Sequence, residues 1–445
     1  MALLRFFKSF YPGKLVYYAG FAAAALFVLS FFAPLFFTLG CALLFFTGIV
    51  VLTDVVLLYS RPGLYAERIV ADRLSNGDEN NIRIHFTNQY SFAVRCIVLE
   101  ELPFQFQERN WKRTMQIARE SNAVLEYTLT PVMRGLCHFG FVNVFVKSPL
   151  GMVQRRYPCA QPVTVNVYPS YVQMRRYQLA AIGNKLQETG AKRLRKLGHS
   201  TEFEQIKEYV PGDDYRTVNW KATARNSNLM VNTFTDERSQ PVFCVINKGR
   251  VMKMPFGGMT LLDHAINATL ALLNVALLKG DKAGLITYAE GVDTFLPADK
   301  KRGQLNLLSE ALYKEETHFS EPDNEALFSV VRNKISQRSL LLFFTNFESF
   351  ESLERQLPFF KRLAHYHLLI VIFFENTELK MLVEGEAKTT EDIYIKTIAE
   401  KYRHEKRLMV KELHKHGIIA VLTTPQLLTV TALNKYLELK NRQSI

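Results

Sequence analysis

Residues 202–225 read EFEQIKEYVPGDDYRTVNWKATAR and are the most informative stretch of the chain. They combine two acidic clusters, a Pro-Gly turn and one of the two tryptophans. The sequence PGDD at residues 211–214 is typical of a turn, because proline presets φ, glycine tolerates a positive φ and an aspartate can cap the segment that follows. We therefore expect residues 215–226 to form a helix whose late cations complement its dipole.

Three interpretations of this stretch are open. Its charges could cap and pair with one another at a domain junction, which is a common structural arrangement. Alternatively the stretch is an exposed docking surface for a partner, or it holds a catalytic carboxylate pair, although no histidine or cysteine nucleophile lies within it. The residues that would bind a partner are Glu208, Tyr209, Pro211, Gly212, Asp213, Asp214, Arg216, Trp220, Lys221 and Arg225.

The run EYVPGDDYRTVNWKATAR resembles the signature of the bacterial family filed as "domain of unknown function 58". TPVMRGLCHFG from Thr130, SPLGMVQRR from Ser148 and VNVYPSY from Val165 resemble its β-domain signatures, so the resemblance extends over nearly the whole chain. It implies a membrane hairpin, a β-domain and a von Willebrand factor A-like domain. It also implies a partnership with a MoxR-type AAA+ ATPase in envelope or protein-complex assembly.

Composition narrows the class of protein. A chain of 445 residues is long enough for two or three domains. Its five cysteines are scattered without a CxxC pair, which disfavours a disulfide framework or a structural zinc site and fits a reducing compartment. The sequence contains no P-loop, GxSxG, HExxH or GxGxxG motif, so we expect neither enzymatic activity nor a cofactor.

Two apolar segments near the N-terminus, residues 15–32 and 35–59, predict a transmembrane helical hairpin. Each is near or above the length that crosses a hydrocarbon core of about 30 Å. Cations on both flanks place the soluble domains in the cytoplasm, beneath a bacterial inner membrane. These flanking cations are Arg5, Lys8, Lys14, Arg61, Arg68 and Arg73.

Asp54 interrupts the second apolar segment near its cytoplasmic end. An acid within a membrane span is a functional candidate by default. At this depth the carboxylate could instead be solvated or paired with Arg61.

The predicted fold class is a multi-domain, membrane-anchored protein. Residues 1–64 form the hairpin, residues 65–170 a β-sandwich-like domain, residues 171–240 a basic linker with the PGDD signature, and residues 241–445 a doubly wound α/β domain. Short alternating runs predict the β-domain, which would act as a spacer or a binding face. Continuous apolar strands between amphipathic helices predict a parallel sheet covered on both faces.

The formal net charge of the whole chain is +13, which raises the question of an anionic partner. The most cationic stretch is residues 175–200. The stretch could contact anionic lipid at about 1 kcal/mol per cation, or pair with the acidic residues 202–208. Few aromatic residues lie among its cations, so nucleic-acid binding is weakly supported. The charged residues are Arg175, Arg176, Lys185, Glu188, Lys192, Arg193, Arg195 and Lys196.

Metal-binding von Willebrand factor A-like domains carry Asp-x-Ser-x-Ser after the first strand, with a threonine and an aspartate on later loops. Here residues 247–251 read NKGRV, residues 302–305 read RGQL and the later strand ends in a Thr-Asn pair. Magnesium requires oxygen ligands that this set lacks, and the two cations repel a dication, so we expect no metal. The positions concerned are Asn247, Lys248, Gly249, Arg250, Val251, Thr345 and Asn346.

Lys248 and Arg250 could instead bind a partner's carboxylate or another anion in this crevice. Alternatively the loop is simply exposed, and its sequence has changed without a new function. We therefore predict a membrane-tethered, non-catalytic scaffold or adaptor that works with a MoxR-type AAA+ ATPase and other membrane or cytoplasmic proteins. The alternatives are a hydrolase that uses the carboxylates of residues 202–214, and binding of anionic lipid or nucleic acid by the basic stretch.

Overall fold

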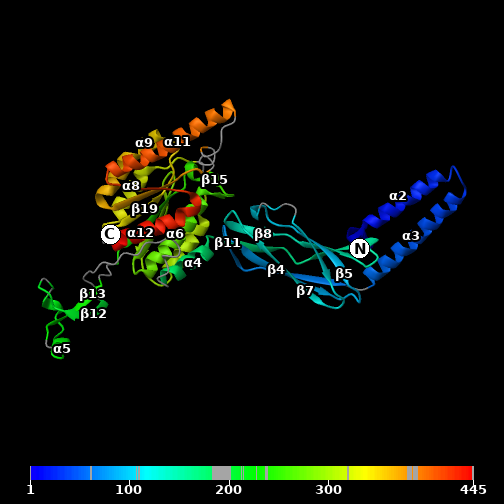
Figure 1. The fold of residues 1–445 in the computed structure, drawn as a ribbon, viewed down its shortest axis with the longest axis horizontal. Helices are drawn as coiled ribbons and strands as arrows, with labels where there is room; N and C mark the ends of the chain where they lie inside the picture. The colour runs from blue at the N-terminus through cyan, green and yellow to red at the C-terminus, as the bar shows by residue number, and fades with distance from the viewer. Residues whose placement is uncertain are drawn as a thin grey trace. The chain divides into compact units, whose positions relative to one another are not determined.

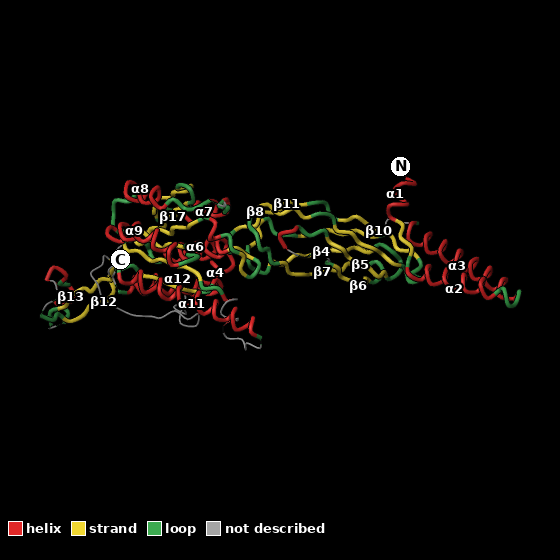
Figure 2. The backbone as a smooth tube through the Cα atoms, turned by 90° about the horizontal axis from the view of Figure 1, so that it is seen from above, coloured by secondary structure: helices red, strands yellow, loops and turns green. Residues whose placement is uncertain are grey.

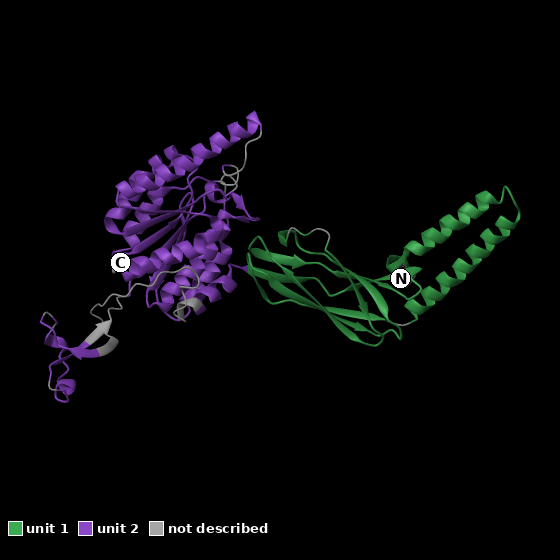
Figure 3. Ribbon diagram, in the orientation of Figure 1, with its two compact units in different colours: residues 1–167 green, residues 168–445 purple. Residues whose placement is uncertain are grey.

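The computed structural model describes residues 2–60, 63–106, 108, 111–182, 202–211, 213, 215–226, 228–235, 239–317, 320–377, 383 and 389–442. The chain divides into two compact units, residues 1–167 and residues 168–445 (Figure 3).

Two apolar helices near the start of the first unit lie side by side (Figure 1). α3 (Leu35–Tyr59) is long and apolar enough to cross a membrane, judged by length and composition alone. α2 (Lys14–Leu29) is a shorter apolar helix that ends three residues before the predicted boundary of residue 32. They are preceded by α1 (Ala2–Ser9) and the short strand β1 (Phe10–Pro12).

The rest of this unit is a β-domain, in agreement with the alternating pattern of its sequence. One sheet has the order β1-β10-β9-β5-β6, and the two smaller sheets have the orders β3-β11-β8 and β2-β4-β7. Inward side chains from all three sheets form one apolar core. The strands are β2 (Leu64–Ile69), β3 (Arg73–Ser75), β4 (Asn80–Asn88), β5 (Val94–Glu100), β6 (Lys112–Ile117), β7 (Asn122–Leu129), β8 (Gly135–Phe139), β9 (Val142–Lys147), β10 (Val153–Cys159) and β11 (Val163–Tyr168).

The end of α3 is anchored to the β-domain. Asp54 is buried, and its Oδ2 accepts a hydrogen bond of 2.7 Å from the backbone N–H of Val153. The carbonyl oxygen of Leu58 accepts hydrogen bonds from Arg155 at 2.5 Å and from the Tyr90 hydroxyl at 2.8 Å. A solvated Asp54 is therefore wrong, because the β-domain covers this end of the helix; Arg61 lies outside the described residues.

The second unit is built on a six-stranded sheet of order β18-β17-β14-β19-β20-β21, in which only the pairing of β18 with β17 is antiparallel. The strands are β14 (Pro241–Asn247), β17 (Lys282–Tyr288), β18 (Val292–Asp299), β19 (Leu340–Phe344), β20 (Leu368–Phe374) and β21 (Ile419–Thr423). The helices are α4 (Tyr171–Ile182), α6 (Leu261–Leu278), α7 (Gln304–Lys314), α8 (Asn324–Lys334), α9 (Phe350–Tyr366), α11 (Thr390–Lys415) and α12 (Leu428–Asn441).

Helices cover both faces of this sheet (Figure 2). Along β14, Val242, Cys244 and Ile246 pack toward α6, α7 and α12. The intervening Phe243 and Val245 pack toward α8, α9 and α11. This alternation confirms the predicted α/β layering, since successive side chains of a strand point to opposite faces.

Candidate functional site

Pro211 and Asp213 of the PGDD signature lie in the segment that joins the two strands of a β-hairpin. β12 (Glu202–Glu208) pairs antiparallel with β13 (Met230–Thr235). The segment between them is not the single predicted helix of residues 215–226, because Val218 pairs with Val231 in an isolated β-bridge. A 3-10 turn, Tyr215–Thr217, precedes this bridge, and a short helix, α5 (Trp220–Thr223), follows it.

Local hydrogen bonds explain this interruption. The Asn219 side chain accepts from the backbone N–H of Ala222 at 3.0 Å and thereby caps α5. Its amide also donates to Asn232 Oδ1 at 2.8 Å, which ties the segment to β13. Pairing across the hairpin therefore overrides the helix propensity of the isolated sequence.

Asp213 stabilises the turn at the hairpin tip. Its carboxylate accepts from Lys207 Nζ at 2.9 Å and from the backbone N–H of Val210 at 3.0 Å. The hydrogen bond from Lys207, followed by that from Val210, lowers the pKa of Asp213 below its ordinary value. The contacts of Asp213 thus agree with the interpretation in which the charges of this stretch cap and pair with one another. Gly212 and Asp214 lie outside the described residues.

The tip exposes large aromatic side chains. Tyr215 and Trp220 are each 72% exposed, and Val210 is 57% exposed. A two-stranded hairpin is marginally stable in water without a hydrophobic partner. Exposed aromatic side chains on such a hairpin are the kind of residue that anchors protein interfaces.

Cations accompany these aromatic residues. Lys221 and Arg225 line a hollow of about 500 Å³, next to Ile206 and Met230. Among the described residues, neither cation has an ion-pair partner. The other described signature residues lie in the same segment. The Arg216 guanidinium is 5.8 Å from the Tyr215 ring, and Pro211 is exposed. Tyr209 donates its backbone N–H to the Leu229 carbonyl oxygen, and the Glu208 carboxylate accepts from the Asn228 side-chain amide.

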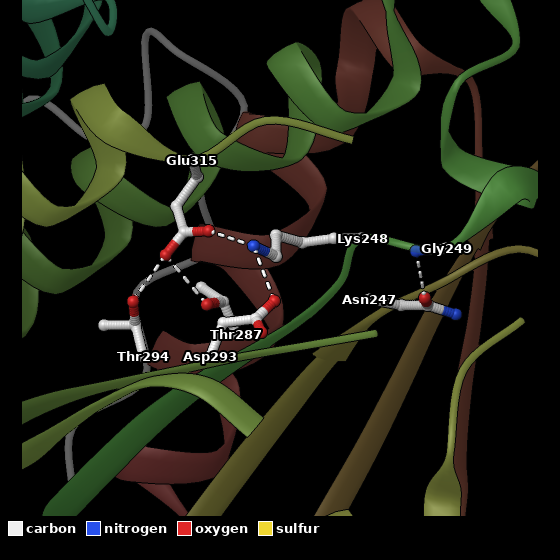
Figure 4. Close-up of polar contacts among 7 residues, drawn as sticks. All are labelled: Asn247, Lys248, Gly249, Thr287, Asp293, Thr294 and Glu315. Carbon is white, nitrogen blue, oxygen red and sulfur yellow. Dashed lines mark hydrogen bonds and ion pairs between the residues drawn. The ribbon is translucent and has the colours of Figure 1, made fainter. Parts of the chain in front are cut away.

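The carboxyl edge of the large sheet brings Asn247 and Thr345 together. Asn247 is buried, and its Nδ2 donates to Thr345 Oγ1 at 3.0 Å. Its Oδ1 accepts from the Gly249 N–H at 2.8 Å (Figure 4). The amide oxygen is thus already used to close its own loop. These neutral groups do not fit a hydrated dication, which favours carboxylate ligands.

Lys248 points the other way, into a polar network around the buried Glu315 (Figure 4). Its Nζ lies 2.7 Å from Asp293 Oδ2 and 2.6 Å from Glu315 Oε2. Glu315 Oε1 accepts from the hydroxyls of Thr287 at 2.8 Å and Thr294 at 2.6 Å. Burial alone would lower the pKa of Lys248, but its hydrogen bonds to the two carboxylates outweigh burial and raise that pKa. Lys248 therefore cannot receive a partner's carboxylate, which corrects that part of the predicted crevice.

The predicted loop of residues 302–305 lies at the opposite edge of the sheet. Gln304 Nε2 donates to the carbonyl oxygens of Ala283 at 2.8 Å and Pro297 at 3.0 Å. Ala283 is near the start of β17, whereas Asn247 ends the neighbouring parallel strand. The prediction that this loop lies beside Asn247 is wrong, because the antiparallel strand β18 returns the chain to the opposite edge of the sheet before residues 302–305. At the carboxyl edge, Arg250 instead donates its backbone N–H to Ser320.

A small cleft remains beside Arg250. It has a volume of about 160 Å³ and is lined by residues that include Arg250, Val251, Arg355 and Gln356. Arg250 pairs with Glu348 at 3.2 Å, and both side chains are more than half exposed.

Asn346, in contrast, accepts a hydrogen bond of 2.8 Å from Lys406 on α11. Among the described residues, no group of three or more His, Cys, Asp or Glu side chains is placed to hold a metal ion.

Comparison with known proteins gives a family but no activity. Residues 205–411 match the family described as "Protein of unknown function DUF58". The "Uncharacterized protein YeaD" of Bacillus subtilis (strain 168) is 25% identical over 231 residues, which are 50% of this chain and 55% of that protein. The chain thus spans about half the length of this relative.

Solved structures show weaker likenesses. The solution structure of a CARDB domain from Pyrococcus furiosus is 15% identical and covers 24% of this chain and 94% of that chain, with a TM-score of 0.17. Proximal thread matrix protein 1 from the mussel byssus is 11% identical and covers 46% of this chain and 48% of that chain, with a TM-score of 0.26. At these scores neither likeness assigns a fold.

Proposed function

We propose, from the premise that this chain belongs to the DUF58 family of proteins of unknown function, that it is a membrane-tethered, non-catalytic adaptor for protein partners. Its proposed partner is a MoxR-type AAA+ ATPase, as the family resemblance implies. The adaptor would act in protein-complex or envelope assembly.

The tether in this proposal is the pair α2 and α3, inserted as a transmembrane hairpin. The length and apolar character of α3 support insertion. Cations on both flanks of the pair support a cytoplasmic location for the soluble domains, beneath a bacterial inner membrane. The anchoring of Asp54 and Leu58 to the β-domain would then hold that domain close to the bilayer.

The α/β domain in this proposal is a von Willebrand factor A-like domain that has lost its metal site. Its support is the parallel sheet with helices on both faces and the amide of Asn247 at the end of β14. Such a domain would serve as a platform for proteins rather than as a magnesium-dependent receptor.

The observation that carries the docking role is the exposure of Tyr215 and Trp220, each 72%, at the tip of the β12–β13 hairpin. Lys221 and Arg225 add positive charge beside them. An aromatic anchor next to cations fits a partner surface that offers an apolar pocket rimmed by carboxylates.

The test is copurification of the ATPase with the full chain from detergent-solubilised membranes. We expect Trp220→Ala and the double variant Lys221→Glu with Arg225→Glu to lose the ATPase. Tyr65→Ala is the matched control, because Tyr65 is a 60% exposed aromatic residue on β2 of the β-domain. Retention of the ATPase by both hairpin variants, with the hairpin still protected from hydrogen exchange, contradicts the proposed docking site.

The alternative functions gain no specific support. The hydrolase hypothesis needs carboxylates that are available to a substrate, but the Asp213 carboxylate already accepts hydrogen bonds from Lys207 and Val210. The side chains of Glu202 and Glu204, and all of Asp214, lie outside the described residues. Of the basic stretch, Arg175 and Arg176 are exposed on α4, and residues 183–201 lie outside the described residues. Nothing in the described part of the chain favours nucleic acid.

A further inference from the structure

A basic pocket lies where α2 meets the β-domain, within the first unit. It has a volume of about 370 Å³. Its lining includes three cations, Lys14, Arg95 and Lys147, together with Gln116, and among the described residues no carboxylate lines it. None of the three cations has an ion-pair partner among the described residues.

The strand register forces two of these cations together. Arg95 on β5 is directly opposite Lys147 on β9, and it is also opposite Gln116 on β6. Side chains directly opposite in antiparallel strands share a face, with Cβ atoms about 5 Å apart, and like charges in such positions are destabilising. Because no described carboxylate offsets this repulsion, the pocket is arranged for an external anion.

The third cation is placed by the start of α2. The backbone N–H of Gly13 donates to the Met152 carbonyl oxygen at 2.7 Å, and Pro12 is opposite Val153 in the β1–β10 ladder. The turn of residues 148–151 is itself fixed, because Ser148 Oγ accepts from the N–H groups of Leu150 and Gly151 at 3.1 and 3.2 Å. Lys14, the first residue of α2, is thus held beside this turn.

The surroundings of the pocket are apolar on the side of the helix pair. Leu15 and Leu150 line the pocket and are 47% and 43% exposed, and Tyr17 and Tyr18 on α2 are 57% and 65% exposed. Tyrosines at the start of an apolar helix are typical of the membrane–water interface. A ligand here would place an anionic group on the cations and a hydrocarbon chain along α2.

We propose that this pocket binds the phosphate headgroup of an anionic phospholipid. This inference rests on the membrane insertion of α2 and α3 proposed above. The site differs from the basic stretch of residues 175–200, because it is formed by the β-domain and the start of the first apolar helix. A cation near an anionic bilayer surface contributes about 1 kcal/mol, which corresponds to about a fivefold preference for each of the three residues.

The test compares lipid retention by the purified full chain in detergent, using native mass spectrometry with phosphatidylglycerol against phosphatidylcholine. We expect the wild type to retain phosphatidylglycerol selectively. Arg95→Gln and Lys147→Gln should each reduce that selectivity about fivefold. Lys112→Gln is the matched control, since Lys112 is exposed on β6 but does not line the pocket, and it should leave selectivity unchanged.

Two further measurements make the result decisive. Suppose that glycerol phosphate displaces the bound lipid as effectively as added phosphatidylglycerol does. The site is then one for soluble phosphates, and the lipid assignment is overturned. Equal losses in Lys112→Gln and Lys147→Gln, or unchanged selectivity in the pocket variants, also overturn it. Flotation with phosphatidylcholine vesicles tests insertion separately: failure to float refutes the membrane tether, whereas flotation without headgroup selectivity refutes only this inference.

Discussion

The Lys248 ammonium lies 2.6 Å from Glu315 Oε2, and both side chains are almost wholly buried beside the carboxyl edge of the large sheet. The same ammonium also pairs with Asp293. The positive charge that the sequence places next to a degenerate metal site is therefore neutralised inside the domain. The exposed cation left at this edge by the NKGRV segment is Arg250.

Lys248→Met should destabilise the α/β domain by about 3 kcal/mol, because it leaves Glu315 buried without its cation. Hydrogen exchange of peptides from β17, measured by mass spectrometry on the full chain, would report the loss. The double variant Lys248→Met with Glu315→Gln should lose less stability than the sum of its two single variants.

Arg250→Met provides the control for this prediction. Arg250 and Glu348 are 3.2 Å apart with side chains 52% and 56% exposed, so this pair should contribute less than about 1 kcal/mol. Equal effects of Arg250→Met and Lys248→Met would show that burial does not distinguish the two ion pairs.

Lys406 should make the stability of the α/β domain depend on pH in the alkaline range. Its ammonium donates to Asn346 Oδ1 and to the Phe347 carbonyl oxygen, and burial lowers its pKa from 10.5 to about 8. Between these two pH values the unfolded chain binds more protons than the folded chain, so stability rises as pH rises through this window. Lys406→Met should remove the rise, measured as hydrogen-exchange protection of β20 and α11.

Lys401→Met is the matched control on the same helix. Lys401 is 77% exposed and lies 3.9 Å from Glu405, so its substitution should leave the pH dependence as in the wild type. If the wild-type protection falls between pH 8 and pH 10.5, the proposed origin in Lys406 is wrong.

The parts of the fold that could be predicted are those with a strong local pattern. The helix α6 (Leu261–Leu278) has such a pattern, because a largely apolar segment follows Thr260, which caps it together with Asp263. The parallel strands were equally clear as continuous apolar runs. The edge strand β18 reads VDTFLPAD, is only partly buried and contains a proline, so it lacked that signal.

Side-chain direction was the main obstacle at the candidate site. The sequence placed Lys248 next to Asn247, yet alternation and the distant Glu315 direct its ammonium into the domain. The hairpin was missed because the pairing of Val218 with Val231 joins residues that no local pattern connects. Likewise, the Arg95–Lys147 juxtaposition depends on strand register, which a single sequence does not reveal.

Asp54 should act as a structural acceptor at the end of α3. Asp54→Ala would leave the buried Val153 N–H without its 2.7 Å partner, at a cost of about 1–3 kcal/mol. Asp54→Asn keeps an acceptor oxygen and should retain most of the stability. Protection of the Val153 amide from hydrogen exchange distinguishes the two; equal protection in wild type and Asp54→Ala would show that the hydrogen bond is dispensable.

Gly13 should be required for the close approach of α2 to the β-domain. A Cβ atom at this position would lie 2.5 Å from the Gly151 carbonyl oxygen and 2.7 Å from that of Met152, so the backbone would have to move. We expect Gly13→Ala to destabilise the β1–β10 pairing by about 1–3 kcal/mol, the usual cost of overpacking. Faster hydrogen exchange in residues 10–13 and 151–155 would measure this loss.

Gly20→Ala is the matched control within α2. Nothing lies within 4 Å of a Cβ atom at Gly20, and alanine is favoured over glycine inside a helix by about 1 kcal/mol. This variant should therefore exchange no faster than the wild type. If Gly13→Ala behaves in the same way, the contact between the start of α2 and residues 151–152 does not constrain the junction, and Lys14 is not held at the basic pocket.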